Sequence, residues 1–247
     1  MKKNGNEVLL GAILLGLSIA AYMVHYLLFR DAHHIFIYLV GDIAFVFIEV
    51  FLVTVIIHRL LDNREKQQRL QKLHMVIGAF FSELGIKLLT MMAAGDPSRD
   101  ILASRLVVNN RWSRQEFTEV VKWLKVYSYS IDSNRVDWDA FKIQLNSKRD
   151  FLLRLFENPY LLEHESFSEL LQAVFHLSDE LEARSDFSGL PHPDLVHLTG
   201  DVKRGYQLLI VQWAQHMQYL KADYPYLFSL AARQNPFDNA ASVVVKE

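Results

Sequence analysis

The stretch YLVGDIAFVFIEVF, from Tyr38 to Phe51, decides the fold of the N-terminal region. It lies in an apolar run from residue 35 to 57 in which Asp42 and Glu49 are the only charged side chains. A second apolar run, residues 8–29, precedes it. Each run is slightly longer than the ~20 residues that a helix needs to cross a ~30 Å hydrocarbon core. The sequence therefore predicts an integral membrane protein with two transmembrane helices, at about 8–29 and 35–57.

The two predicted spans form a hairpin, because the link RDAHH between them has only five residues. Positive charges flank its open end, before the first span and after the second, whereas Arg30 is alone in the link; the flanking residues are Lys2, Lys3, Arg59, Arg64, Lys66, Arg69 and Lys72. Positive residues remain on the cytoplasmic side. We therefore expect a multi-pass protein of the cell membrane with both termini in the cytoplasm. A cleaved signal peptide is the alternative for residues 8–29, but the run is longer than the usual 7–15-residue apolar core of such a peptide.

The carboxylates make the second span costly to insert. Its seventeen Ile, Leu, Val and Phe residues contribute roughly -8 kcal/mol, whereas two central carboxylates cost about 5 to 7 kcal/mol. Asp42 and Glu49 are seven residues apart, which places them on one face of a helix, about 10 Å apart along its axis. Tyr38 lies on the same face. Acidic groups inside a membrane normally face protein or water.

Self-association would hide this acidic face from lipid. Ala12, Gly16 and Ala20 recur every four residues of the first span, and such a face allows close helix packing. Hairpins repeated around an axis would place Asp42 and Glu49 in stacked rings like those of cation channels. We therefore expect a homo-oligomer whose partners are the lipid bilayer, further copies of itself and inorganic cations.

Two other interpretations of the carboxylates remain open. His25 lies at roughly the depth of Asp42 and is a possible carboxylate partner, which would make the acidic residues structural. A proton relay or a small-solute site is the other alternative, since ionisable groups inside membranes are commonly functional.

Residues 59–94 predict one long helix that leads out of the membrane. Its apolar positions step by three or four: Leu70, Leu73, Ile77, Phe80, Leu84, Leu88 and Met91. This spacing fits a coiled-coil seam or the core-facing stripe of a globular domain. Lys87 interrupts the seam, which favours the core stripe.

Residues 95–233 predict a cytoplasmic, all-helical domain, so the fold class is all-α. SRQE, beginning at Ser113, and SFSE, beginning at Ser166, read as capping boxes. Expected helices lie near 98–108, 114–131, 137–157, 166–184, 194–222 and 225–233. Residues 234–247 are expected to form a flexible tail.

Two histidine–carboxylate pairs are the candidate metal ligands of this domain. His176 with Glu180, and His197 with Asp201, each have i,i+4 spacing on consecutive predicted helices, so each pair can present two ligands from one face. Such pairs are also common on solvated helix faces. The sequence alone favours that second interpretation, and no metal site or cofactor is predicted.

The remaining features exclude several function classes. The chain has no cysteine, and its 26 basic and 28 acidic residues give a net charge of -2, which does not suit binding to nucleic acid. Phosphate loops, nucleophile elbows and zinc-protease helices are absent from the sequence, so no enzyme is predicted. The sequence favours a cation-conducting homo-oligomeric channel or transporter whose cytoplasmic domain serves assembly or gating. A membrane-anchored helical scaffold or sensor without transport activity is the alternative.

Overall fold

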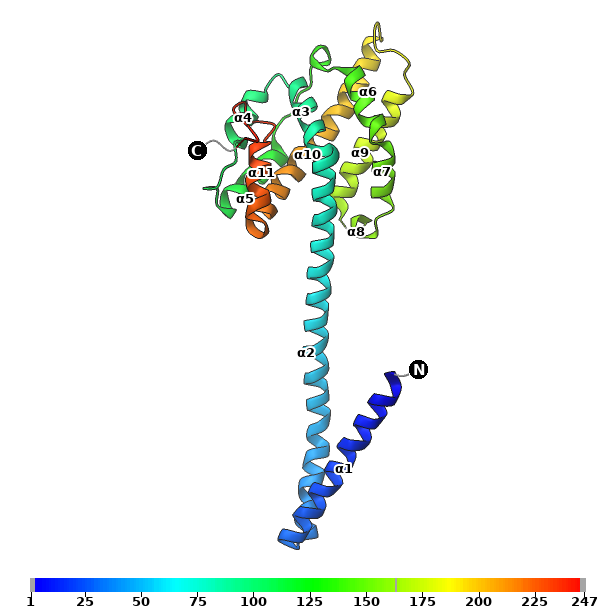
Figure 1. The fold of residues 1–247 in the computed structure, drawn as a ribbon, viewed down its shortest axis with the longest axis vertical. Helices are drawn as coiled ribbons and strands as arrows, with labels where there is room; N and C mark the ends of the chain where they lie inside the picture. The colour runs from blue at the N-terminus through cyan, green and yellow to red at the C-terminus, as the bar shows by residue number, and fades with distance from the viewer. Residues whose placement is uncertain (1–2, 163, 245–247) are drawn as a thin grey trace. The chain divides into compact units, whose positions relative to one another are not determined.

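A computed structural model gives the fold and describes residues 3–162 and 164–244 (Figure 1). Every regular element in these residues is helical, which confirms the all-α prediction. The chain divides into two compact units, Met1–Gln67 and Gln68–Glu247. Residues 1–2, which include the predicted cytoplasmic charge of Lys2, and the end of the expected tail, 245–247, lie outside the described residues.

Two apolar helices form the first unit. Helix α1 spans Lys3–Phe29 and helix α2 begins at Ala32, so the link is shorter than the five residues expected. Arg30 adopts a left-handed conformation with φ of 50°. Asp31 Oδ1 accepts hydrogen bonds from the amides of His33 and His34, at 2.9 and 3.2 Å. This cap starts α2 three residues earlier than the apolar pattern indicates.

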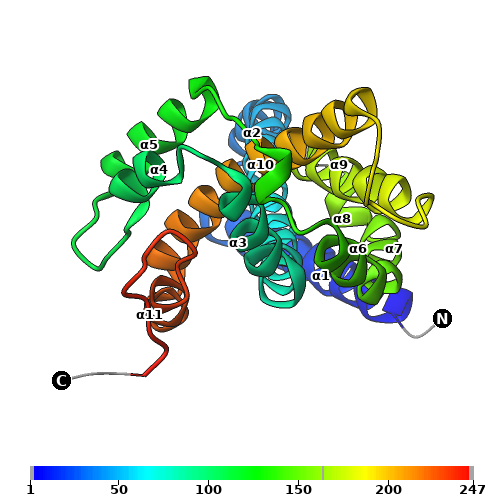
Figure 2. The ribbon, with the colours of Figure 1, turned by 90° about the horizontal axis from the view of Figure 1, so that it is seen from above.

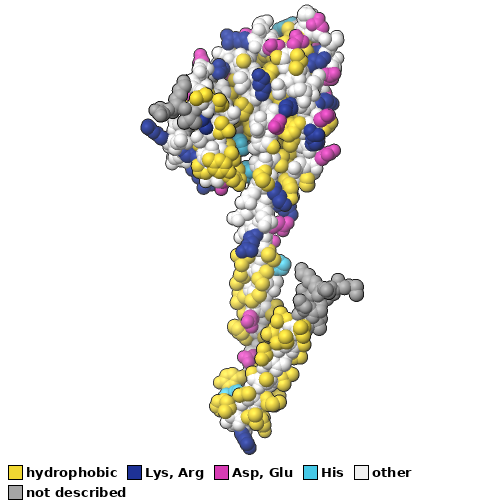
Figure 3. Space-filling model, viewed as in Figure 1, with side chains coloured by type: hydrophobic (Ala, Val, Ile, Leu, Met, Phe, Trp, Pro, Cys, Tyr) yellow, Lys and Arg dark blue, Asp and Glu magenta, His cyan; other side chains and the backbone are white. Residues whose placement is uncertain are grey.

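Hydrophobic side chains cover the visible face of both hairpin helices (Figure 3). By length and composition, both helices could cross a membrane. From Leu9 onward, none of the apolar side chains in the two predicted spans is buried in the single chain.

Helix α2 spans Ala32–Phe80 and continues through a π-helical segment, η1 (Phe81–Gly85), into α3 (Ile86–Gly95). The helical run therefore ends close to residue 94, where the sequence predicts it. Five residues of the apolar stripe are buried, namely Leu73, Ile77, Phe80, Leu84 and Leu88. The core-stripe interpretation is thus confirmed for this segment, while Leu70 remains 44% exposed.

Helix α10, His192–Asp223, is the centre of the second unit (Figure 2). Helix α9 (Glu165–Glu182) packs along one side of it, and α5 (Arg114–Val126) and α11 (Pro225–Arg233) along the other. The remaining elements are α4 (Arg99–Leu106), η2 (Ser133–Arg135), α6 (Trp138–Ser147), α7 (Arg149–Phe156) and α8 (Pro159–Leu162). Helices α6, α7 and α8 contact α9 rather than α10. Two layers of helices thus share one core through the α9–α10 pair.

The capping prediction is confirmed at Ser113 and wrong at Ser166. Ser113 and Glu116 form the reciprocal capping box of α5. The N-cap of α9 is instead His164, whose Nδ1 accepts from the Phe167 amide at 3.3 Å. Because an imidazole nitrogen takes the cap, the Ser166 hydroxyl is free to accept a hydrogen bond from Gln212 Nε2 at 2.8 Å.

Two helix lengths differ from the sequence prediction. The helix expected over 137–157 is broken at Lys148, which leaves helical geometry with φ of -116° and ψ of 8°. Asn146 and Ser147, which favour helix ends, precede the break. Helix α5 ends at Val126 rather than near 131, and the Tyr129 hydroxyl donates to the Leu124 carbonyl at 2.8 Å.

The flexible-tail prediction is wrong for residues 235–239. Phe237 is 1% exposed, and its ring packs 5.5 Å from that of Trp213. Asn235 is 3% exposed and donates to the Leu106 carbonyl at 2.7 Å. One buried aromatic ring and one buried amide therefore fix this part of the tail to the core.

Gly85, at the end of the π-helical segment, faces two buried rings. A Cβ atom there would lie 2.7 Å from Phe81 Cδ1 and 2.9 Å from Phe80 Cε1. We expect Gly85→Ala to lower the free energy of unfolding by about 1–3 kcal/mol, because these rings have no room to move. Gly200→Ala is the matched control, since its Cβ would meet no atom within 4 Å.

The control should raise stability by about 0.5–1 kcal/mol, because alanine is a better helix former than glycine. Denaturant unfolding followed by circular dichroism measures both effects. Equal changes in the two variants would contradict the packing described for Gly85.

Candidate metal centre

The α9–α10 pair brings together the two histidine–carboxylate pairs. His176 and Glu180 lie one turn apart on α9, and His197 and Asp201 lie one turn apart on α10. Because the helices are antiparallel, His176 faces Asp201 and Glu180 faces His197. One ligand atom from each residue lies within 4.8 Å of the others. The four candidate ligands therefore form one cluster, although the sequence favoured two separate solvated pairs.

The spacing within this cluster suits a tetrahedral ion. His176 Nε2 is 3.5 Å from Asp201 Oδ2 and 3.8 Å from Glu180 Oε1. His197 Nε2 is 3.4 Å from each of the same two oxygens. Ligands about 2.1 Å from the centre of a tetrahedron are about 3.4 Å apart. Four of the six ligand separations thus lie between 3.4 and 3.8 Å, and all lie within 4.8 Å.

Asp201 is the buried member of the cluster. The residue is 4% exposed, and its Oδ2 has no hydrogen-bond partner among the described residues. A carboxylate oxygen buried in this way costs free energy unless a cation or a hydrogen-bond donor faces it. The side chains of His176 and His197 are 46% and 51% exposed, so they close the cluster on its solvent side.

Arginines hold the outer oxygens of both carboxylates. Arg184 Nη1 donates to Glu180 Oε2 at 2.7 Å. The same guanidinium makes a two-pronged contact with Asp194, at 2.6 and 2.8 Å. Arg204 Nη2 lies 3.7 Å from Asp201 Oδ1. Such outer contacts fix the orientation of metal ligands.

The contacts of Arg184 also favour the ionised forms of Glu180 and Asp194. The hydrogen bond from Arg184 holds the pKa of Glu180 below its ordinary value, and His197 adds to this effect. Arg184 likewise lowers the pKa of Asp194, while the two carboxylates raise the pKa of Arg184. Glu180 is thus ready to act as a ligand at neutral pH.

The donor set selects among metal ions. Two imidazole nitrogens and two carboxylate oxygens suit zinc and related divalent transition metals. Calcium and magnesium prefer oxygen ligands alone. Arg184 was missed by sequence reasoning, although its i,i+4 spacing from Glu180 is a signal that could have found it.

The predicted ion-path residues lie on the exposed surface of the hairpin. Tyr38, Asp42 and Glu49 are all exposed in the single chain. No hydrogen bond or ion pair joins either carboxylate to His25 among residues 3–162 and 164–244. His25 instead packs against Phe29, with ring centroids 4.8 Å apart. Pairing with His25 is therefore not seen within one chain.

The predicted packing face of α1 is also uncovered. Ala12, Gly16 and Ala20 are exposed, and a Cβ atom at Gly16 would meet nothing within 4 Å. This face is available to another helix, as the oligomer hypothesis requires.

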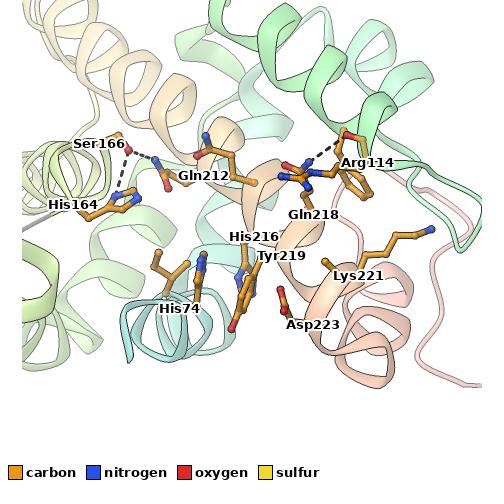
Figure 4. A pocket seen from close by; sticks show the side chains of 14 residues that line it. His74, Arg114, His164, Ser166, Gln212, His216, Gln218, Tyr219, Lys221 and Asp223 are labelled. Atoms are coloured by element: carbon orange, nitrogen blue, oxygen red, sulfur yellow. Dashed lines mark hydrogen bonds between the residues drawn. The ribbon is translucent and has the colours of Figure 1, made fainter. Parts of the chain in front are cut away.

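A second polar site lies at the other end of the α9–α10 pair (Figure 4). This cavity has a volume of about 730 Å³ and is lined by the end of α2, the starts of α5 and α9, and the last turns of α10. Ser166 and Gln212 meet across it. His74 stacks on Tyr219 with ring centroids 3.5 Å apart, and His216 stacks on Phe81 at 5.1 Å.

Comparison with known proteins identifies the family. A family model described as the C-terminal helical domain of the uncharacterized protein MJ1433 matches residues 69–233. A second model, described as the N-terminal helical domain of MJ1433, matches residues 2–61. The boundary between the two matches agrees with the division of the structure after Gln67.

The full-length relative gives the same result. The protein described as uncharacterized protein MJ1433, from Methanocaldococcus jannaschii, is 45% identical over 240 residues, which cover 97% of this chain and 96% of the relative. The chain therefore belongs to the MJ1433 family. No solved structure matches the chain.

The buried imidazole of His216 predicts a loss of stability in acid. Burial lowers the pKa of His216 to about 4, and the neighbouring His74 adds to this effect. In the unfolded chain the pKa of this histidine is near 6.5. Between about pH 4 and pH 6.5 the unfolded chain therefore binds the proton more readily than the folded protein does. The free energy of unfolding should therefore fall, by up to roughly 3 kcal/mol, as the pH drops from about 6.5 to about 4.

His216→Phe should flatten this part of the stability curve, because phenylalanine keeps the stack on Phe81 and cannot take up a proton. Unfolding at a series of pH values measures the difference. An acid limb as steep in the variant as in the wild type would rule out His216 as its source.

Proposed function

We propose that this protein is a membrane-anchored metal-binding protein of the sensor type. In this proposal, the N-terminal hairpin inserts into the lipid bilayer. The helical domain binds one divalent transition-metal ion of the zinc class through His176, Glu180, His197 and Asp201. This function corresponds to the sensor alternative that the sequence left open, and the metal site gives that alternative a specific chemistry.

The geometry of the four ligand atoms is the observation that carries the proposal. Three of the four nitrogen–oxygen separations are 3.4 or 3.5 Å, close to the edge of a tetrahedral zinc site, and all four ligand atoms lie within 4.8 Å of one another. Two unrelated histidine–carboxylate pairs on solvated helix faces would have no reason to place their ligand atoms at these separations across two helices. The Oδ2 atom of the buried Asp201 accepts no hydrogen bond and lies 3.4 and 3.5 Å from the two imidazole nitrogens, which also supports a cation at this position.

The number of ligands favours a sensing or structural role over catalysis. Catalytic zinc sites keep one position for water or substrate, whereas structural sites are closed by four protein ligands. Here the protein itself provides four ligands from two helices. An ion bound there would fasten α9 to α10, the helix on which α3, α5 and α11 also pack.

The hairpin supports the membrane anchor. Helices α1 and α2 each contain a segment long and apolar enough to cross a bilayer. Within the unit Met1–Gln67 these side chains are exposed to the surroundings rather than packed in a core. Burying them in lipid removes this apolar surface from water.

A cation channel or transporter is the second candidate function. The observation that favours it is the exposure of Asp42 and Glu49, which have no partner among the described residues of the single chain. In a homo-oligomer, repeated acidic faces could line an axial path. This candidate and the metal site are compatible, since an ion-binding domain can regulate a membrane pore.

The metal proposal predicts binding of one zinc ion per chain. After treatment with a chelator, the full-length protein in detergent should bind Zn²⁺ in calorimetric titration. A free ion concentration 100 times the Kd should stabilise the fold by about 2.7 kcal/mol. His176→Ala or His197→Ala should weaken binding at least about tenfold, whereas His192→Ala, at the exposed start of α10, should not.

Asp201→Asn separates a metal site from a simple ion-pair network. Without metal, this variant should be at least as stable as the wild type, because it removes a buried charge. With Zn²⁺ present it should gain much less stability than the wild type. An ion-pair network would instead make Asp201→Asn equally destabilising with and without the metal. That result, or no zinc binding by the wild type, would refute the proposal.

The channel candidate predicts cation flux that depends on the acidic face. In reconstituted liposomes, Glu49→Gln should reduce cation flux, because the amide keeps the shape of the side chain and removes its charge. Asp42→Asn should do so more weakly, since it lies nearer the water. Asp62→Asn, beyond the apolar run, is the control. Absence of flux in the wild type, or equal flux in all assembled variants, would exclude this candidate.

A further inference from the structure

The cavity at the far end of the α9–α10 pair has the size and lining of a ligand site. Its volume of about 730 Å³ lies in the range of small-molecule pockets. Ten residues of α9, or about 15 Å of helix, separate Ser166 at this cavity from His176 at the metal cluster. The cavity is therefore a separate site, and its ligand does not depend on the proposed metal.

The rim of the cavity favours an anion. The first residue of α5, Arg114, and the N-cap residue of α9, His164, both line it. Ser113 caps the Glu116 amide of α5 and His164 caps the Phe167 amide of α9, but the amides before these lack partners within the helix and attract negative groups. Two helix N-termini thus converge on one rim.

The charged side chains at this rim are also mostly positive. Arg114 and Lys221 are the basic lining residues, and Asp223 is the acidic one. The guanidinium of Arg114 makes no ion pair or hydrogen bond among the described residues. Lys221 Nζ donates to the carbonyls of Asn110 and Asn109, at 2.6 and 3.5 Å, which leaves one of its three donors. A free guanidinium is well suited to a phosphate group.

The floor of the cavity offers neutral hydrogen-bonding groups. His216 is 7% exposed, and its Nδ1 has no hydrogen-bond partner among the described residues. Gln212, at 4% exposed, lies beside it, and Gln215 also lines the cavity. Figure 4 shows the amide of Gln212 at Ser166 and the rings of His74, His216 and Tyr219 close together. These groups can pair with a neutral polar ring or stack on its face.

We propose that this cavity binds a phosphorylated small molecule. The phosphate lies at the rim against Arg114, Lys221 and the start of α9, and a neutral hydrogen-bonding group of the ligand reaches His216 and Gln212. A soluble nucleotide and a lipid headgroup share this phosphomonoester chemistry. The cavity has room for a molecule of nucleotide size rather than for inorganic phosphate alone.

Binding to the full-length protein in a neutral detergent tests this site. The probes are AMP, adenosine, inorganic phosphate and dihexanoyl phosphatidic acid, each followed by calorimetry and by thermal unfolding. We expect AMP or phosphatidic acid to bind more tightly than adenosine or inorganic phosphate. Tighter binding of AMP would identify a soluble ligand, and tighter binding of phosphatidic acid would identify a lipid headgroup.

Variants show whether binding occurs in this cavity. Arg114→Gln should weaken binding about tenfold or more, because it removes the free guanidinium. His216→Phe should also weaken it by about tenfold while keeping the stack on Phe81. Arg111→Gln is the matched control, since Arg111 precedes the same helix and does not line the cavity.

Three results would overturn the proposal. These are binding of none of the phosphorylated probes at millimolar concentration, equal binding of adenosine and AMP, and binding unchanged by both cavity variants. Circular dichroism of Arg114→Gln, whose side chain has no partner to lose, confirms that reduced binding does not arise from unfolding.

Discussion

The antiparallel packing of α9 against α10 is the contact on which both candidate sites depend. Three side-chain pairs join the two helices in antiparallel order, namely Glu180–His197, His176–Asp201 and Ser166–Gln212. From one pair to the next, the residue on α9 lies nearer the start of its helix and the residue on α10 lies nearer the end of its helix. The register itself is set by fully buried apolar residues on the two helices, such as Leu177 and Leu198. A slip by one residue would turn each polar side chain by about 100° around its helix and separate every pair. Hydrophobic packing therefore determines the chemistry available at both ends.

The sequence predicts the residue pairs within each helix, but it does not predict that the pair on α9 faces the pair on α10. Spacing of four residues places His176 with Glu180, and His197 with Asp201, because helix geometry fixes neighbours within a helix. Whether the two pairs face each other depends on the rotation of α9 about its axis. That rotation is set by residues such as Phe167 and Leu177, whose burial follows from the complete core. The four candidate ligands could thus be found from the sequence, but their assembly into one candidate metal centre could not.

The same distinction explains the two caps. Ser113 and Glu116 follow a known local pattern and form the predicted capping box. At α9 the same pattern begins at Ser166, yet the tertiary hydrogen bond from Gln212 takes the serine hydroxyl and His164 caps the helix. Tertiary contacts also bury Phe237, which the turn-forming residues around it, Asn235, Pro236 and Asp238, gave no reason to expect. Local signals fail where a buried group elsewhere in the domain offers a stronger partner.

Besides Asp96, which is 2% exposed, three carboxylates among the described residues occupy positions that are costly for a charge. Asp201 is buried with an oxygen that lacks a hydrogen-bond donor, and Asp42 and Glu49 interrupt an apolar run of membrane-spanning length. Their surroundings imply different partners. Asp201 faces two imidazoles at fixed distances within its own domain, so one small cation can compensate it without any change of fold. Asp42 and Glu49 are exposed on a single hairpin, so in a bilayer their compensation would have to come from outside that hairpin. A second copy of the chain, with its own acidic face, would increase the repulsion unless a cation, a proton or water lies between the copies. Oligomerisation alone is therefore not sufficient to explain the acidic face, and a cation, a proton or water would be part of any arrangement of copies that encloses it.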